Sequence, residues 1–153
     1  METLLLERAA GVVTLTLNRP EKKNAVNGAM WREMRQVFDE VAATVEDRVL
    51  VVTGAGGAFC SGADLSDASG GRAMHPLDGV RVINHVALAL HRLPKPTIAK
   101  VGGVAAGAGC NLAFGCDLVV AADDARFSEI FARRGLTVDF GGTWLLPRLV
   151  GLH

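Results

Sequence analysis

Hydrophobic and polar residues alternate near the start of the chain. Within residues 12–17, apolar side chains recur at every second position, at Val13, Leu15 and Leu17. This period of two predicts a strand with one face against a core. Residues 3–8 are expected to form its hairpin partner, because a glycine-containing turn separates the two segments.

Two later stretches have the period of an α-helix instead. Apolar residues follow Asn27 at spacings of three and four, charged residues occupy the opposite face, and Asn27 is a suitable N-cap. The second stretch ends before Pro94 and Pro96, which cannot continue a helix. The apolar positions are Met30, Met34, Val37, Phe38, Val41 and Val45 in the first predicted helix, and Val80, Ile83, Ala87 and Leu90 in the second.

Short apolar runs at Val49–Thr53, Thr97–Val101 and Leu118–Ala121 predict three further buried strands, the first of them covered on both faces. The small-residue segment Gly102–Gly115 separates the last two runs and is expected to contain a short helix. The resulting order, ββ–α–β–α–β–α–β, predicts an α/β fold with mostly parallel strands covered by helices. We expect one domain over residues 1–153.

Composition narrows the possible functions. The formal net charge is zero, so the basic excess that attracts nucleic acids or anionic membranes is absent. The three cysteines are scattered among small and apolar residues, which predicts buried free thiols in a reducing compartment, the cytoplasm. His75, His85 and His91 lack metal-ligand spacing, so no metal site is expected. The polar, aperiodic segment Ser66–Pro76 predicts a mobile surface loop.

The segment Val101–Ala122 is nearly all small and apolar, and it has about the length of a membrane span. It also contains many glycines and the polar residues Asn111 and Asp117. A strand, turn, helix and second strand explain this composition better than a membrane helix does.

Two segments carry the candidate chemistry, GAFCSGADL at Gly57–Leu65 and GVAAGAGCNLA at Gly103–Ala113. Each follows a predicted buried strand and runs toward a helix. Small side chains at such a turn let a ligand approach the backbone N–H groups, and a helix N-terminus favours negative charge there. Two such turns could form an oxyanion hole, and close packing of a helix on a strand is the structural alternative.

The sequence also resembles the crotonase (enoyl-CoA hydratase/isomerase) family over essentially its whole length. The resemblance rests on motifs in the family's order, RPEKKNAV (19–26), GAFCSGADL, KPTIAKVGGVAAGAG (95–109), CDLVVAADDARF (116–127) and GLTVDFGGTWLLPRLVG (135–151). It implies a crotonase-like ββα spiral fold that binds an acyl-CoA thioester and stabilises its enolate. Family members continue through a further helical region, which this chain is expected to lack after its last residue.

The resemblance also implies roles for individual residues. The backbone N–H groups of Ala63 and Ala108 would hold the thioester oxygen, with Gly107 preceding the second donor. Asp64 and Leu65 would complete a CoA-binding turn, and Lys23 and Ala25 would line the pantetheine and adenine side. No separate cofactor is implied, because CoA is part of the substrate, and the family implies a trimer or hexamer.

Two positions depart from the hydratase pattern. The glutamates that add water in hydratases of this family correspond here to Asn111 and Phe131. Neither an amide nor a phenyl ring can act as a base near neutral pH. Glu129 lies two residues before Phe131, which predicts a different face of a helix and a solvated charge.

Asp139 is the remaining candidate base. It lies between Val138 and Phe140, where isomerase-like members of the family carry an acidic residue facing the acyl group. One carboxylate could remove a proton beside the thioester and return it two carbons along, and desolvation would raise its pKa toward neutrality. Asp139 could instead cap the helical segment Gly141–Leu149. The open alternatives are a hydratase or hydrolase of the same family and a catalytically silent acyl-CoA-binding subunit.

Overall fold

The computed structural model describes residues 1–67 and 76–153. Most of the predicted loop Ser66–Pro76, including His75, lies outside the described residues.

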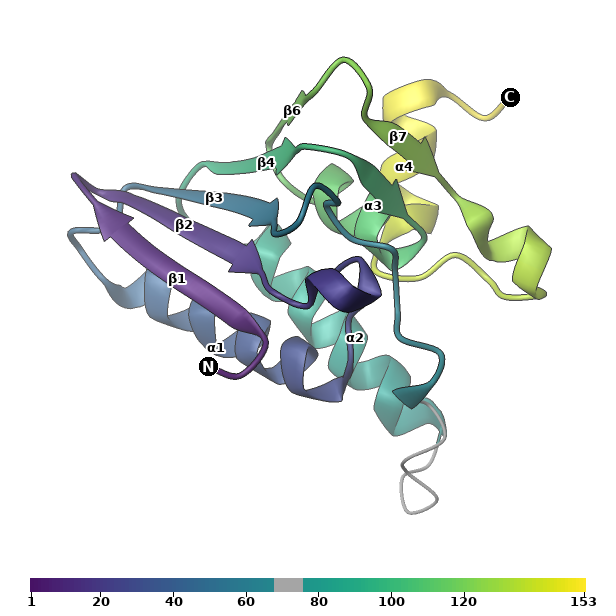
Figure 1. Ribbon diagram of the computed structural model, residues 1–153, viewed down its shortest axis with the longest axis horizontal. Helices are drawn as coiled ribbons and strands as arrows, with labels where there is room; N and C mark the ends of the chain where they lie inside the picture. The colour runs from purple at the N-terminus through teal and green to yellow at the C-terminus, as the bar shows by residue number, and fades with distance from the viewer. Residues whose placement is uncertain (68–75) are drawn as a thin grey trace.

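A five-stranded sheet forms the centre of the described structure, in the order β1-β2-β3-β4-β6 (Figure 1). β1 (Leu4–Ala9) and β2 (Val12–Leu17) form the predicted antiparallel hairpin, and Val13, Leu15 and Leu17 are fully buried. The other neighbouring strands are parallel. They are β3 (Val49–Gly54), β4 (Thr97–Val101) and β6 (Leu118–Ala121).

Two long helices, α1 (Gly28–Ala43) and α2 (Pro76–His91), pack together along one side of this sheet (Figure 1). Asn27 caps α1 as predicted, since its side chain accepts a hydrogen bond from the Met30 N–H at 2.9 Å. The apolar face of α1 is buried in the core, but the prediction for Val45 was wrong. The helix ends at Ala43, so Val45 is beyond the last helical turn and is 87% exposed.

A second layer was largely missed by the sequence analysis. β5 (Val104–Ala106) and β7 (Arg126–Ser128) form a parallel two-stranded sheet of their own. Three-residue strands have too little periodicity to be detected in a sequence, and backbone pairing defines them. The short helices of the described chain are η1 (Pro20–Lys22), α3 (Ala108–Phe114), η3 (Ile130–Arg134) and α4 (Gly142–Val150).

The prediction that residues 118–121 form a buried strand was partly wrong. They form β6, but β6 is the edge strand of the sheet and all four residues are exposed. An apolar run indicates a strand without showing which surfaces will cover it. The predicted α/β architecture, with mostly parallel strands and helices, is otherwise confirmed.

The apolar segment Val101–Ala122 is divided among β4, β5, α3 and β6. Among the residues that the structure describes, no helix is both long enough and apolar enough to cross a membrane.

Candidate active site

The two small-residue turns predicted from the sequence lie side by side. The backbone N–H groups of Phe59 and Cys60 both donate to the Val104 carbonyl at 3.0 Å, and the Ala106 N–H donates to the Cys60 carbonyl at 2.8 Å. A Cβ atom placed on Gly62 would lie 3.7 Å from the Ala108 nitrogen. The ends of both turns therefore meet at one place, although they are more than forty residues apart in sequence.

The backbone N–H groups of Ala63 and Ala108 are free to bind a ligand. Within the described residues, neither donates a hydrogen bond to the protein. Ala108 is the first residue of α3, where backbone N–H groups have no acceptor within the helix. Gly107 precedes it with φ 52° and ψ −126°, a conformation that favours glycine. This geometry is compatible with an oxyanion hole.

The segment containing Lys23 and Ala25 runs beside the first turn. The Ser61 N–H donates to the Lys23 carbonyl at 3.0 Å, and the Val26 N–H donates to the Gly62 carbonyl at 2.8 Å. Lys23 is exposed, whereas Ala25 is buried. Tertiary contacts therefore place both predicted CoA-side residues next to the turn that carries Ala63.

Asp64 follows Ala63 and is already engaged by other side chains. Its carboxylate accepts a 2.5 Å hydrogen bond from the Ser66 hydroxyl and pairs with Arg19 at 2.9 Å. These contacts lower the pKa of Asp64 to about 2, with the Ser66 hydrogen bond contributing most. Asp64 therefore shapes the turn as an ionised group, while the next residue, Leu65, is 56% exposed.

Asp139 is half-buried, and its Oδ1 atom has no hydrogen-bond partner among the described residues. Burial, and secondarily the charge of Glu129, raises the pKa of Asp139 to about 6. The alternative that Asp139 caps α4 through its side chain is wrong. The N-cap residue is Gly141, and the N-terminus of α4 has no side-chain capping hydrogen bond. Instead the backbone carbonyl of Asp139 accepts hydrogen bonds from the Gly142 N–H at 2.9 Å and from Asn111 Nδ2 at 3.0 Å.

The prediction that Glu129 is a solvated charge was also wrong. Both of its carboxylate oxygens are buried, and neither makes a well-formed hydrogen bond with a described residue. Desolvation raises the pKa of Glu129, and weaker interactions with the side chains of Cys110 and Asn111 oppose this rise. That prediction assumed a regular helix through residues 129–131. In fact Glu129 joins β7 to η3 as the N-cap residue of η3, with φ −81° and ψ 66°.

Asn111 and Phe131, the two departures from the hydratase pattern, are both buried beside these acids. Asn111 is fully buried, and a Cβ atom on Gly142 would lie only 2.3 Å from its Oδ1. Gly142 therefore leaves the room that the Asn111 side chain occupies. Phe131 lies over the start of α3, with its ring 3.7 Å from the position of a Cβ on Gly107.

The three cysteines do not add a nucleophile. Cys60, Cys110 and Cys116 are free and buried, as the sequence predicted. Desolvation raises the pKa of each thiol to about 12, so all three are neutral near pH 7. Among the described side chains, no group of three or more His, Cys, Asp or Glu could hold a metal ion.

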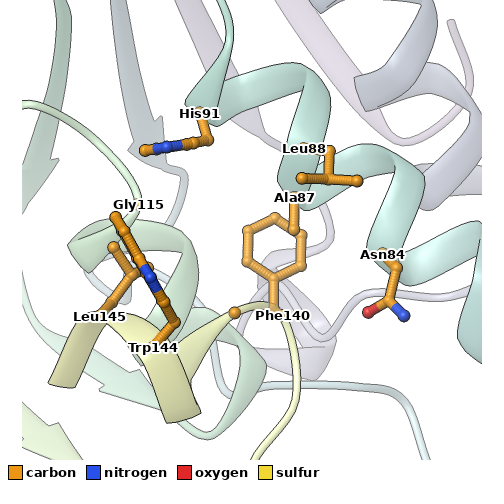
Figure 2. A pocket seen from close by; sticks show the side chains of 9 residues that line it. Asn84, Ala87, Leu88, His91, Gly115, Phe140, Trp144 and Leu145 are labelled. Atoms are coloured by element: carbon orange, nitrogen blue, oxygen red, sulfur yellow. The ribbon is translucent and has the colours of Figure 1, made fainter. Parts of the chain in front are cut away.

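A cavity of about 370 Å³ lies between α2 and α4 and contains none of the predicted site residues. Figure 2 shows the Phe140 ring pointing toward Ala87 of α2, with His91 and Trp144 also lining the cavity. Phe140 is the chain neighbour of Asp139, yet Phe140 faces this cavity and stacks on Trp31 at 5.4 Å. We place the candidate chemistry at the unpartnered groups around α3, because the buried carboxyl groups lie there, whereas His91 is the one titratable side chain among the residues that line this cavity.

The chain is similar to known proteins over almost its whole length. The enoyl-CoA hydratase/isomerase family matches residues 7–153. The 1,2-epoxyphenylacetyl-CoA isomerase of Escherichia coli K12 is 44% identical over 99% of this chain, and the short-chain-enoyl-CoA hydratase of Clostridium acetobutylicum is 37% identical over 99%. This chain spans 59% of the length of each of these two relatives.

Solved structures share the fold of this chain. The crystal structure of an enoyl-CoA hydratase from Mycobacterium avium subsp. paratuberculosis K-10 superimposes with a TM-score of 0.90 at 32% identity, covering 99% of this chain and 60% of that one. The predicted crotonase-like fold is therefore confirmed. Because the family match extends over almost all of its residues, this chain belongs to the enoyl-CoA hydratase/isomerase (crotonase) family.

Proposed function

We propose that the protein binds an acyl-CoA thioester and moves the double bond of an enoyl-CoA, with Asp139 as the general base. The observation that carries this proposal is the half-buried carboxyl of Asp139, whose buried Oδ1 has no partner among the described residues and whose pKa of about 6 suits proton transfer near neutrality. The names of the relatives include both an isomerase and a hydratase, and both named substrates are CoA thioesters.

In the proposed reaction the thioester oxygen accepts hydrogen bonds from the Ala63 and Ala108 N–H groups. The Asp139 carboxylate removes a proton from C-2 of a 3-enoyl-CoA, and the electron pair of that C–H bond passes into the thioester to form an enolate. The two N–H groups stabilise the negative charge on the enolate oxygen. Addition of a proton at C-4 then gives the 2-enoyl-CoA. Lys23, Ala25, Asp64 and Leu65 would contact the CoA portion.

Hydration by the usual pair of glutamates is the weaker proposal, because Asn111 and Phe131 occupy the corresponding positions. A hydrolase or a silent acyl-CoA-binding subunit would give different products from the same substrates. Incubation with 2-enoyl-CoA and 3-enoyl-CoA therefore distinguishes these functions. Isomerisation converts one enoyl-CoA into the other, hydration gives 3-hydroxyacyl-CoA, hydrolysis gives free CoA, and a silent subunit gives no product.

The Asp139→Asn variant tests the role of the base directly. We expect its isomerisation rate to fall by about a hundredfold or more, the usual scale for loss of a general base. In deuterated water the wild type should exchange the C-2 protons of a saturated acyl-CoA, and the variant should not. A variant that exchanges and isomerises like the wild type would remove Asp139 from the mechanism.

We also propose that the protein assembles as a trimer or hexamer, as its family resemblance implies. The exposed apolar strand β6 supports this proposal, because Leu118, Val119 and Val120 are 59%, 41% and 60% exposed. Light scattering coupled to gel filtration would measure the mass, and a monomer at micromolar concentration would contradict the proposal.

A further inference from the structure

We propose that Glu129 is a second catalytic residue, which donates a proton to one carbon of the substrate while Asp139 removes a proton from another. This inference rests on the proposed function and deepens it. Glu129 stands at neither of the positions where hydratases of the family carry their glutamates, which are Asn111 and Phe131 here.

Backbone pairing places Glu129 beside the candidate oxyanion donors. β7 runs parallel to β5 with Ser128 opposite Ala106, and the Gly107 N–H donates to the Ser128 carbonyl at 2.9 Å. Glu129 is the next residue after Ser128, so its backbone is adjacent to the start of α3, where the Ala108 N–H is free. The acid is therefore positioned by the same backbone that forms the second turn.

A buried amide on α3 connects Glu129 with Asp139. Asn111 is fully buried, its Nδ2 donates to the Asp139 carbonyl at 3.0 Å, and its side chain lowers the pKa of Glu129 against the larger rise from desolvation. The Oδ1 of Asn111 has no hydrogen-bond partner among the described residues, like both Glu129 oxygens and Oδ1 of Asp139. Four buried polar atoms without partners around one helix turn indicate a ligand site, because such groups otherwise destabilise the fold.

The charges of the two acids are coupled. The charge of Glu129 is one of the causes that raise the pKa of Asp139, and Glu129 is itself desolvated. Holding two negative charges in this region is unfavourable, which favours one shared proton when a bound substrate excludes water. In the proposed catalytic state that proton is on Glu129, and Asp139 is the carboxylate.

The proton balance of the reaction follows from this state. The Asp139 carboxylate takes the C-2 proton and becomes neutral, and the electron pair of the C–H bond enters the enolate. Glu129 gives its proton to C-4, where the enolate electrons form the new C–H bond, and becomes a carboxylate. After product release, exchange with water returns the proton to Glu129 and removes the proton from Asp139.

Transfer of label within the substrate distinguishes two acids from one. With a 3-enoyl-CoA deuterated at C-2, a lone Asp139 would carry deuterium from C-2 to C-4, whereas two acids place a proton from water at C-4. We expect wild-type product without deuterium at C-4 when analysed by mass spectrometry. Glu129→Gln should isomerise at least tenfold more slowly and should now transfer deuterium to C-4, because only Asp139 remains. Glu46→Gln, an exposed glutamate outside the site, is the matched control and should behave as the wild type.

Each outcome decides the question. Wild-type protein that carries the label to C-4, or a Glu129→Gln variant with wild-type rate and labelling, overturns the role of Glu129 and leaves the proposed function intact. Wild-type protein that does not isomerise overturns both. A slower Glu129→Gln variant whose product still lacks deuterium at C-4 would show that Glu129 only supports the fold, and it would also overturn the inference.

Discussion

Replacing Asp139 with asparagine should stabilise the protein as well as inactivate it. Burial raises the pKa of Asp139 from its ordinary value of 3.8 to about 6, so the folded state holds the carboxylate less favourably than the unfolded state does. Each tenfold change in proton affinity corresponds to about 1.4 kcal/mol, so the rise has an upper limit of about 3 kcal/mol. Because Asp139 is only partly buried, solvent screening reduces the expected gain to about 1–2 kcal/mol.

The stability gained by the Asp139→Asn variant should depend on pH. Above pH 6 the side chain is ionised in both folded and unfolded states, and the full cost of burying its charge is present. As the pH falls from 6 toward 3.8, the folded state takes up the proton first and the cost disappears. The Asp139→Asn variant should therefore be more stable than the wild type at pH 8 and nearly equal to it at pH 4. Its backbone contact with Asn111 is unaffected, because that bond uses the main-chain carbonyl.

Urea unfolding followed by circular dichroism at both pH values measures the difference. The slope of free energy against urea should be unchanged, which separates a true stability change from a change in the unfolded state. Asp123→Asn, at an exposed position, is the control and should have little effect at either pH. A variant that is less stable than the wild type at pH 8, or equally stabilised at both pH values, would show that the carboxylate of Asp139 does not carry a desolvation cost in the folded state.

Three further predictions concern the two turns. Ala108→Pro removes one candidate oxyanion donor at the first position of α3, which tolerates proline. The isomerisation rate should fall by the equivalent of about 3 kcal/mol of transition-state stabilisation, while the circular dichroism spectrum stays unchanged. An unchanged rate would exclude this N–H as a donor. Gly109→Ala would place a Cβ atom 2.4 Å from the Cys60 carbonyl, and urea unfolding should show a loss of about 1–3 kcal/mol; an equally stable variant would mean that α3 can move away. Asp64→Asn weakens the ion pair with Arg19, so calorimetry should show weaker CoA binding and urea unfolding should show a loss of about 1 kcal/mol of stability. An unchanged CoA affinity would exclude Asp64 from the CoA-binding turn.

Local patterns were sufficient to predict most of the larger elements. The alternation along residues 12–17 and the helical spacing after Asn27 reflect which side chains face the core. The structure confirms the hairpin predicted from the first pattern and the N-cap predicted for the second. The small residues of 57–65 and 103–113 likewise indicated turns where backbone atoms approach closely. Hydrogen bonding between Cys60 and Ala106 confirms that close approach. Such features depend on side-chain size, polarity and spacing, which can be read directly from a sequence.

The environment of each acid depended on contacts between distant segments. Oδ1 of Asp139 is buried without a partner among the described residues, just before the N-cap Gly141 of α4, and Asn111, twenty-eight residues earlier, holds the Asp139 carbonyl. The carboxylate oxygens of Glu129 are buried directly after β7, which pairs with β5, and both strands are too short to show periodicity. A pattern along the chain shows the size, polarity and spacing of its side chains. Desolvation and coupling between charges depend on which other residues surround it, and here only the tertiary structure brings those residues together.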